Sequence, residues 1–261
     1  MHLRAATLAV FLLSSLLTGC GKSEPEKPKP LDLSKAPVTE PEPEPEAPAR
    51  KRAPAFTIDD VSVQVGFSRS NLTQPNGAAD KAGIEQFEKE LGEAKEFIDG
   101  QTVTLEVKRE AQVSWVASYI EELYELGASG VKVKTDTRSD YPSEVSFVAA
   151  SRLGKPDGCS AVGMIGDDKS TLVWKLSGGA AQKRQKGMGG PDLTITGDTL
   201  LALAKKCSSD LFVAQGQKTI VWGFVYDFAA SAMALEGGPF KRASVPTKRP
   251  TPGQPVSLAR E

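Results

Sequence analysis

The chain has 261 residues, and its 32 basic and 33 acidic residues leave a formal net charge of −1. Nucleic-acid-binding domains are strongly basic, so this balance argues against a nucleic-acid partner. The only histidine is His2, which lies inside a segment expected to be cleaved. Because histidine is the commonest general base and a common metal ligand, we expect no enzymatic activity, no metal site and no cofactor.

Residues 1–19 have the pattern of a secretion signal. A short charged start precedes an apolar run, Ala5–Leu17, that is shorter than the roughly 20 apolar residues of a membrane span. The sequence Leu17-Thr18-Gly19-Cys20 resembles the lipobox of bacterial lipoproteins. The resemblance implies that Cys20 carries lipid, palmitate included, and anchors a periplasm-facing protein in the cell envelope. Gly21, in place of an aspartate, favours the outer membrane. The alternative is an ordinary secretion signal with an incidental cysteine.

Two segments have compositions that do not support a packed core. Residues 20–55 are expected to form an extended tether, because the run Glu40–Glu46 alternates glutamate with proline, and proline removes backbone donors and restricts the chain. Residues 241–261 are rich in proline and polar side chains and contain Lys248-Arg249. We expect them to form a disordered basic tail.

Cys159 and Cys207 are the cysteines that remain after Cys20 is assigned to lipid. In an oxidising exported compartment disulfides form and persist, so we expect these two to pair. A bond across this long loop stabilises by roughly 4 kcal/mol on the chain-entropy model. Two buried free thiols are the alternative. Without histidine, two cysteines make a poor metal site.

Residues 56–150 alternate between strand and helix periods. Period-two patterns predict strands at Val61–Phe67, Val103–Val107 and Val131–Val133. Steps of three and four predict helices over Ile84–Ile98 and Val113–Tyr124, each closed by a glycine. The order β-α-β-α-β predicts a layered α/β or α+β domain, with a small mixed sheet and amphipathic helices on one face.

Residues 151–240 are less regular and are expected to form a second α+β domain. Predicted strands are Ala161–Ile165, Leu172–Leu176, Leu211–Val213 and Ile220–Phe224, and predicted helices are Leu200–Cys207 and Asp227–Leu235. Their order follows roughly the plan of residues 56–150, which favours the interpretation of a diverged second copy. Lys183–Pro191 is basic and rich in glycine, and it is predicted to be an exposed loop.

The segment 101–135 resembles the periplasmic domain of the ExbD/TolR family of biopolymer-transport proteins. The parts that match the family's strand, turn, helix, glycine turn and threonine-ended strand are Val103–Val107, Val113–Val116, Ile120–Leu123, Leu126–Ala128 and Val131–Thr135. The family's membrane helix, with its acidic residue, is replaced here by the lipoprotein signal, so proton conduction is not expected. The resemblance implies a scaffold or adaptor role near an energy-transducing complex of the envelope.

Two groups of residues are candidates for partner binding. Core packing is the expected role of Trp222, which lies in a predicted strand. Alternatively, Trp222, Phe224 and Tyr226 form a strand edge that pairs with a partner strand. Lys183, Arg184 and Lys186 lie in the glycine-rich loop and suit an anionic partner. That loop lacks the residue order of a phosphate-binding P-loop.

These features lead to one hypothesis and two alternatives. The protein is expected to be a non-enzymatic scaffold or adaptor that binds an envelope protein or peptidoglycan, with homodimer formation as a further mode of association. The first alternative is a solute-binding lipoprotein with a cleft between the two halves. The second is a hydrolase that acts without histidine.

Overall fold

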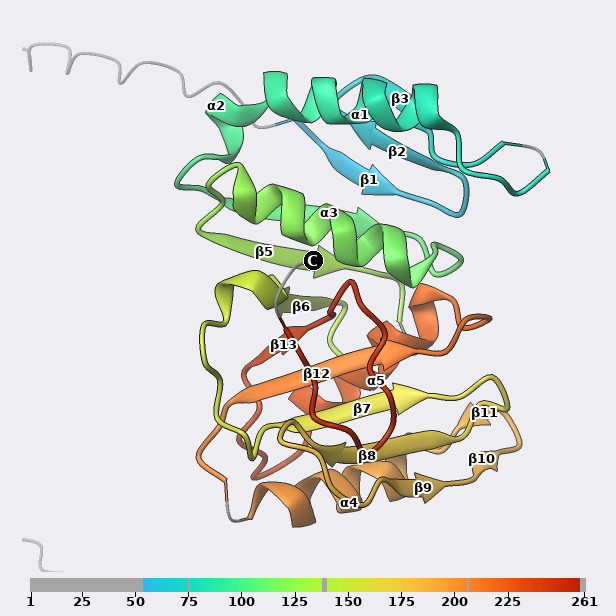
Figure 1. Ribbon diagram of the computed structural model, residues 1–261, viewed down its shortest axis with the longest axis vertical. Coiled ribbons are helices and arrows are strands. Elements are labelled where there is room, and N and C mark those ends of the chain that lie inside the picture. Colours follow the sequence, from blue (N-terminus) through green and yellow to red (C-terminus); the bar gives the residue numbers. More distant parts are fainter. Residues whose placement is uncertain (1–53, 75, 138–139, 206, 259–261) are drawn as a thin grey trace, which may run out of the picture. The chain divides into compact units, whose positions relative to one another are not determined.

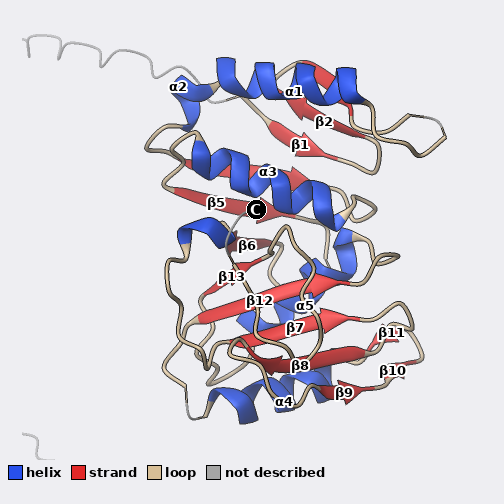
Figure 2. Ribbon diagram, in the orientation of Figure 1, coloured by secondary structure: helices blue, strands red, loops and turns tan. Residues whose placement is uncertain are grey.

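The computed structural model describes residues 54–258 with the exception of 75, 138, 139 and 206. The expected signal peptide, the lipidation site Cys20 and the tether up to residue 53 lie outside the described residues. Within the described part of the chain, a large mixed sheet runs through the fold and helices pack on it (Figure 1, Figure 2).

The described sheet has eleven strands in the order β3-β2-β1-β4-β5-β6-β13-β12-β7-β8-β9, and a separate hairpin pairs β10 with β11. The strands are β1 Phe56–Ile58, β2 Ser62–Val65, β3 Ser68–Asn71, β4 Thr102–Val107, β5 Gly130–Lys134, β6 Glu144–Phe147, β7 Ala161–Ile165, β8 Thr171–Lys175, β9 Gln182–Arg184, β10 Lys186–Gly187, β11 Gly190–Pro191, β12 Leu211–Gly216 and β13 Arg242–Ser244. The helices are α1 Lys81–Glu93, α2 Lys95–Ile98, α3 Val113–Glu125, α4 Leu193–Ala204 and α5 Trp222–Met233, with a 3-10 turn η1 at Ala150–Arg152. This mixed α+β architecture confirms the predicted class. The sheet is large rather than small, because strands from both predicted domains join it.

The two halves of the chain order their elements in the same way. Apart from α2 in the first half and the β10–β11 hairpin in the second, the first half runs β1-β2-β3-α1-β4-α3-β5 and the second runs β7-β8-β9-α4-β12-α5-β13. In each half the first strand pairs antiparallel with the second, and the second pairs antiparallel with the third. The first strand also pairs parallel with β4 or β12, which in turn pairs parallel with β5 or β13. The strand β6 lies between the halves, antiparallel to β5 and parallel to β13.

One face of the sheet carries the main core. The helices α1, α3, α4 and α5 all contribute side chains to one hydrophobic cluster with the sheet. At the junction of the halves, Phe147 of β6 contacts Trp222 of α5, with ring centroids 5.4 Å apart. Further along, Phe212 of β12 contacts Phe228 of α5, with centroids 5.1 Å apart. The helices therefore cover the same face of the sheet across the junction.

The opposite face of the second half is covered by the end of the chain. A second apolar cluster, which includes Trp174 of β8, packs there against Val256 and Leu258. The backbone N–H of Val256 donates to Leu176 at 3.0 Å, and Trp174 Nε1 donates to the carbonyl of Gln254 at 3.1 Å. In Figure 1 this segment, in dark red, crosses in front of β12, β7 and β8.

The prediction of a disordered tail from residue 241 is therefore wrong for the described residues up to 258. Arg242–Ser244 form β13, which pairs parallel to β12 inside the sheet. The proline-rich residues that follow, here called the C-terminal strap (residues 251–258), lie on the sheet. Proline content excludes an inner strand but does not prevent an extended segment from packing on an apolar face.

Several predicted elements are confirmed and one predicted strand is wrong. In addition, residues 183–191, predicted to be an exposed loop, form part of β9 and the β10–β11 hairpin. The strands at β4, β5 and β7 and the helix α3 lie where their periods predicted them. The predicted strand at Ile220–Phe224 is instead the start of α5. Ten residues of that helix are buried, and most of them are apolar, so apolar side chains lie on most of its surface. Periodicity does not separate a strand from a helix in such a segment.

The helix α4 begins earlier than its sequence predicted. Asp192 caps it and accepts a hydrogen bond from the N–H of Ile195 at 3.1 Å. The sequence predicts this helix from Leu200, and the structure also includes Gly197 within it. A side-chain Cβ at Gly197 would come within 2.8 Å of Leu235 Cδ2, so glycine there permits close packing against the segment after α5.

Candidate functional site at the β10–β11 hairpin

The hairpin of β10 and β11 projects between the edge strand β9 and the cap of α4. Its tip carries Met188, which is fully exposed to solvent, with a relative accessibility of 110%. Single exposed apolar side chains are common on protein surfaces, so the feature of interest is that Met188 directly precedes Gly189, which lines a pocket beneath the hairpin. Gly190 has a φ of +129°, a conformation that favours glycine. This backbone conformation folds the hairpin back toward the ring of Phe224, whose Cε1 lies 3.5 Å from the Cβ position of residue 190.

A small pocket of about 170 Å³ lies beneath the hairpin. The first half of the chain contributes Arg109, and the second half contributes the other lining residues, which are Gly189, Pro191, Leu193, Phe224 and Asp227. Ligand pockets for drug-sized molecules are about 300 Å³ or more. The pocket is therefore of a size for one side chain rather than for a whole organic ligand.

An ion pair forms the polar wall of the pocket and joins the two halves. Arg109 Nη2 donates to Asp227 Oδ2 at 2.7 Å, and Arg109 Nη1 donates to Asp227 Oδ1 at 3.0 Å. Arg109 also donates to the carbonyl of Asp136 at 2.6 Å, and Thr137 Oγ1 donates to Asp227 Oδ1 at 3.1 Å. The hydrogen bond to Asp227 raises the pKa of Arg109 above its ordinary value. The carboxylate of Asp227 is therefore held by two partners, Arg109 and Thr137, and the charge of the guanidinium is balanced within the pocket wall.

Phe224 forms the aromatic wall. Lys169 Nζ lies 5.1 Å from the centroid of its ring, within the range of a cation–π contact. Lys169 holds a φ of +61° in the turn between β7 and β8, a conformation that is uncommon for a residue with a side chain. An aromatic surface next to this lysine suits an apolar side chain that is accompanied by a carboxylate.

The structure places the three predicted aromatic residues in different environments. Trp222 and Tyr226 are buried at the junction and do not form an exposed strand edge, so that prediction is wrong for them. Trp222 Nε1 donates to Thr135 Oγ1 at 2.9 Å, and the hydroxyl of Tyr226 donates to the carbonyl of Pro142 at 3.2 Å. Phe224 alone reaches the surface pocket. Trp222 and Tyr226 fill the junction of the two halves. This is the place where the alternative hypothesis expected a solute-binding cleft.

The three predicted basic residues separate as well. Lys183 Nζ pairs with Asp168 Oδ2 at 2.8 Å, and hydrogen bonds from Lys183 and Ser170 hold the pKa of Asp168 well below its ordinary value. Arg184 Nε donates to Thr199 Oγ1 at 2.9 Å, which fixes it to α4. Both residues lie on β9, the edge of the sheet, where a lysine opposes unspecific strand pairing. Lys186, on β10, is exposed beside the hairpin tip.

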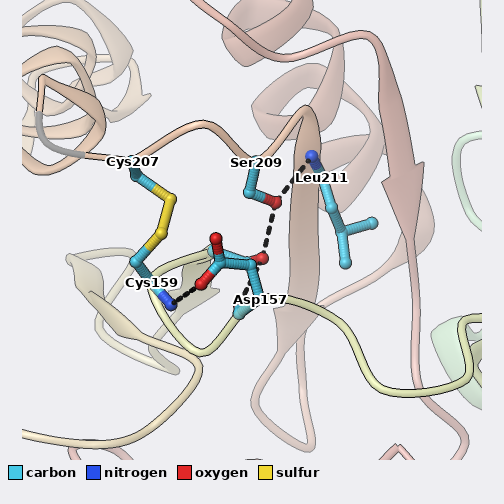
Figure 3. The surroundings of a disulfide bond; sticks show 6 residues. Asp157, Cys159, Cys207, Ser209 and Leu211 are labelled. Carbon is cyan, nitrogen blue, oxygen red and sulfur yellow. Dashed lines mark hydrogen bonds between the residues drawn. A yellow bond between two sulfur atoms is a disulfide. The ribbon is translucent and has the colours of Figure 1, made fainter.

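The structure joins Cys159 and Cys207 in a disulfide, as expected from the sequence (Figure 3). Their Cα atoms are 5.7 Å apart and 48 positions apart in sequence. Asp157 Oδ1 accepts a hydrogen bond from the N–H of Cys159 at 3.2 Å. The bond ties the segment before β7 to the segment before β12. Both sulfur atoms are used in this bond, so the nearby Asp157 does not complete a metal site.

Sequence reasoning missed the ion pair and the cation–π contact. Arg109 lies in the charged run Lys108-Arg109-Glu110, which reads as a solvent-exposed turn, and Asp227 lies 118 positions away. No local pattern connects residues at such a separation. The signal that was available was an aspartate within an apolar segment, Trp222–Met233, because a charge in such a segment requires a partner.

Comparison with protein-family models, with curated proteins and with solved structures gave no match. None of the described helices has the length and apolar character required to cross a membrane.

Proposed function

We propose that the protein is a lipid-anchored periplasmic adaptor without enzymatic activity. It is built from two diverged units that resemble the ExbD/TolR periplasmic domain, joined in one sheet, and it binds an envelope partner through the β10–β11 hairpin. Anchoring through Cys20 and the outer membrane as its location follow from the sequence and are part of the same proposal.

Matching positions in the two halves support the proposed duplication. The strands β4 and β12 both have six residues, and residues 108–112 and 217–221 separate them from the helices that follow. The residues that precede α3 and α5 are Gln112 and Val221, and these two pair with each other in an antiparallel bridge. A two-fold relation places equivalent positions opposite each other in this way. Asp80 and Asp192 also cap α1 and α4 in the same manner.

Met188 is the single observation that carries the proposed binding mode. Its side chain extends fully into solvent next to a pocket that takes one side chain. Interfaces concentrate their energy in a few apolar anchors, each buried in a pocket of the partner. A partner that buries Met188 and inserts an apolar residue beside Phe224 would gain both contacts. Lys169, whose ammonium lies 5.1 Å from the centroid of the Phe224 ring, favours an acidic residue next to that anchor, whereas the charge of Arg109 is already balanced by Asp227.

The proposal is tested by cross-linking pull-down from bacterial envelopes with the full-length lipoprotein as bait. We compare the unchanged protein with Met188→Asp. The matched control is Phe67→Asp, because Phe67 is 106% exposed at a different hairpin turn, between β2 and β3. We expect a specific partner to be recovered with the unchanged protein and the Phe67 variant, and to be lost with the Met188 variant.

Two outcomes contradict different parts of the proposal. Equal recovery with both variants would overturn the role of the hairpin. Recovery of no envelope component, with the bait intact in the membrane, would overturn the adaptor function itself. Metabolic labelling of the bait with palmitate, compared with Cys20→Ala, tests the anchor separately. Loss of label in that variant is the expected result.

A further inference from the structure

A second and larger cavity lies beside the C-terminal strap. Its volume is about 480 Å³, which is within the usual range of small-molecule pockets, about 300 to 1,000 Å³. Three segments form it: the loop 150–158, the end of β8, and the strap. It shares no lining residue with the hairpin pocket. An inference about this cavity therefore does not depend on the proposed partner.

The walls of this groove are largely apolar. The residues that provide them are Ala150, Pro156, Leu176, Pro255, Val256 and Leu258. The backbone groups near it are already in use, since the N–H of Leu176 donates to Ser160 at 2.8 Å and the N–H of Ser177 donates to Gly158 at 2.9 Å. The N–H of Val256 donates in turn to Leu176 at 3.0 Å. These three amides are therefore not available to a ligand, and an acyl chain requires no hydrogen-bond partner.

The groove has a cation at its edge. Lys155 is the one charged residue among the described residues that line it, and it is exposed. No described residue forms an ion pair with it. Ser151, which also lines the groove, donates its hydroxyl to the buried carboxylate of Glu121. An apolar groove with a lysine in its lining is complementary to a ligand with an apolar chain and an anionic end.

We propose that this groove binds a single-chain fatty carboxylate, with the acyl chain along the strap and the carboxylate at Lys155. The strap contributes one wall through Val256 and Leu258, and the segment 150–158 contributes the other. Cys159, which is disulfide-bonded to Cys207, directly follows that segment. The bond holds the end of the loop in place, so the groove is formed before the ligand arrives.

The test is calorimetric titration of dodecanoate into the mature full-length chain carrying Cys20→Ser, below the micelle concentration of the ligand. We expect one site per chain. Lys155→Gln should weaken binding roughly tenfold, because it removes one charged hydrogen bond. Dodecanol, which has the same chain and no charge, should bind the unchanged protein about as weakly as dodecanoate binds the Lys155 variant.

Two further variants separate the groove from unspecific binding. Leu258→Asp places a charge in the apolar wall and should abolish binding, while circular dichroism reports whether the fold is intact. Lys186→Gln removes an exposed lysine at the hairpin and should leave binding unchanged. The proposal is overturned if no dodecanoate binds, if binding persists unchanged in Leu258→Asp, or if Lys155→Gln and Lys186→Gln have equal effects.

Discussion

The Arg109–Asp227 ion pair offers a sharp test of how the two halves are held together. Asp227 is only 8% exposed, whereas Arg109 is 34% exposed. Removing one partner of a buried pair costs about 3–5 kcal/mol, because the other charge is left without compensation. The structure therefore predicts unequal costs for the two single substitutions, depending on which charge remains.

Arg109→Met leaves the buried carboxylate of Asp227 with the hydroxyl of Thr137 as its remaining donor. We expect a cost of about 3 kcal/mol, the lower end of the range for a buried pair. Asp227→Leu leaves Arg109 partly exposed and still bonded to the carbonyl of Asp136. We expect about 1–2 kcal/mol, discounted for solvent screening of the exposed guanidinium. The double variant should cost less than the sum of the two.

The measurement is urea unfolding of the mature chain with Cys20→Ser, followed by tryptophan fluorescence and circular dichroism. Trp222 lies at the junction and reports on its opening. The exposed pair of Lys132 and Glu144 has an N–O distance of 2.8 Å, close to the 2.7 Å of the Arg109–Asp227 pair, and serves as the control. Lys132→Met should cost under about 0.5 kcal/mol. The reasoning is refuted if Asp227→Leu costs more than Arg109→Met, or if the two costs are additive.

Three further outcomes follow from buried tyrosines and from the disulfide. Tyr124→Phe should destabilise by about 1 kcal/mol, because the hydroxyl donates to the carbonyl of Phe147 at 3.0 Å. Tyr119→Phe should be neutral or stabilising, because the buried hydroxyl of Tyr119 has no partner among the described residues. Thermal denaturation compares the two variants. Replacing both Cys159 and Cys207 with serine should lower the free energy of unfolding by about 4 kcal/mol on the chain-entropy model for a loop of 48 positions, and an unchanged midpoint in urea would contradict this. Burial raises the pKa of Tyr226 above its ordinary value of 10.0. The stabilising contribution of the neutral Tyr226 is therefore fully present below pH 10 and is lost as the pH rises further. Tyrosinate absorbance should increase together with unfolding, and ionisation of Tyr226 in an intact fold would contradict this prediction.

Several short strands of the sheet were not predicted from the sequence. The strands β1, β3, β9 and β13 each have three or four residues, too few for an alternating pattern to stand out. Arg242–Ser244 in particular is polar at both ends and is followed by a proline-rich segment. It becomes a strand because β12 and β6 offer backbone partners on either side. Backbone pairing across a sheet depends on neighbours that are distant in sequence.

The sequence by itself determined the class of fold, several of its strands and helices, and the pairing of the two cysteines. The fold class and the elements follow from periodicity within short segments. The cysteine pairing follows from composition, because Cys159 and Cys207 are the cysteines that remain once Cys20 is assigned to lipid. Tertiary structure decided that α5 is a helix, that the strap lies on the sheet, and that Arg109 meets Asp227 beside Phe224. Each of these depends on contacts between residues far apart in the chain. In α5, burial of most of the helix surface also weakens the periodic signal of a helix.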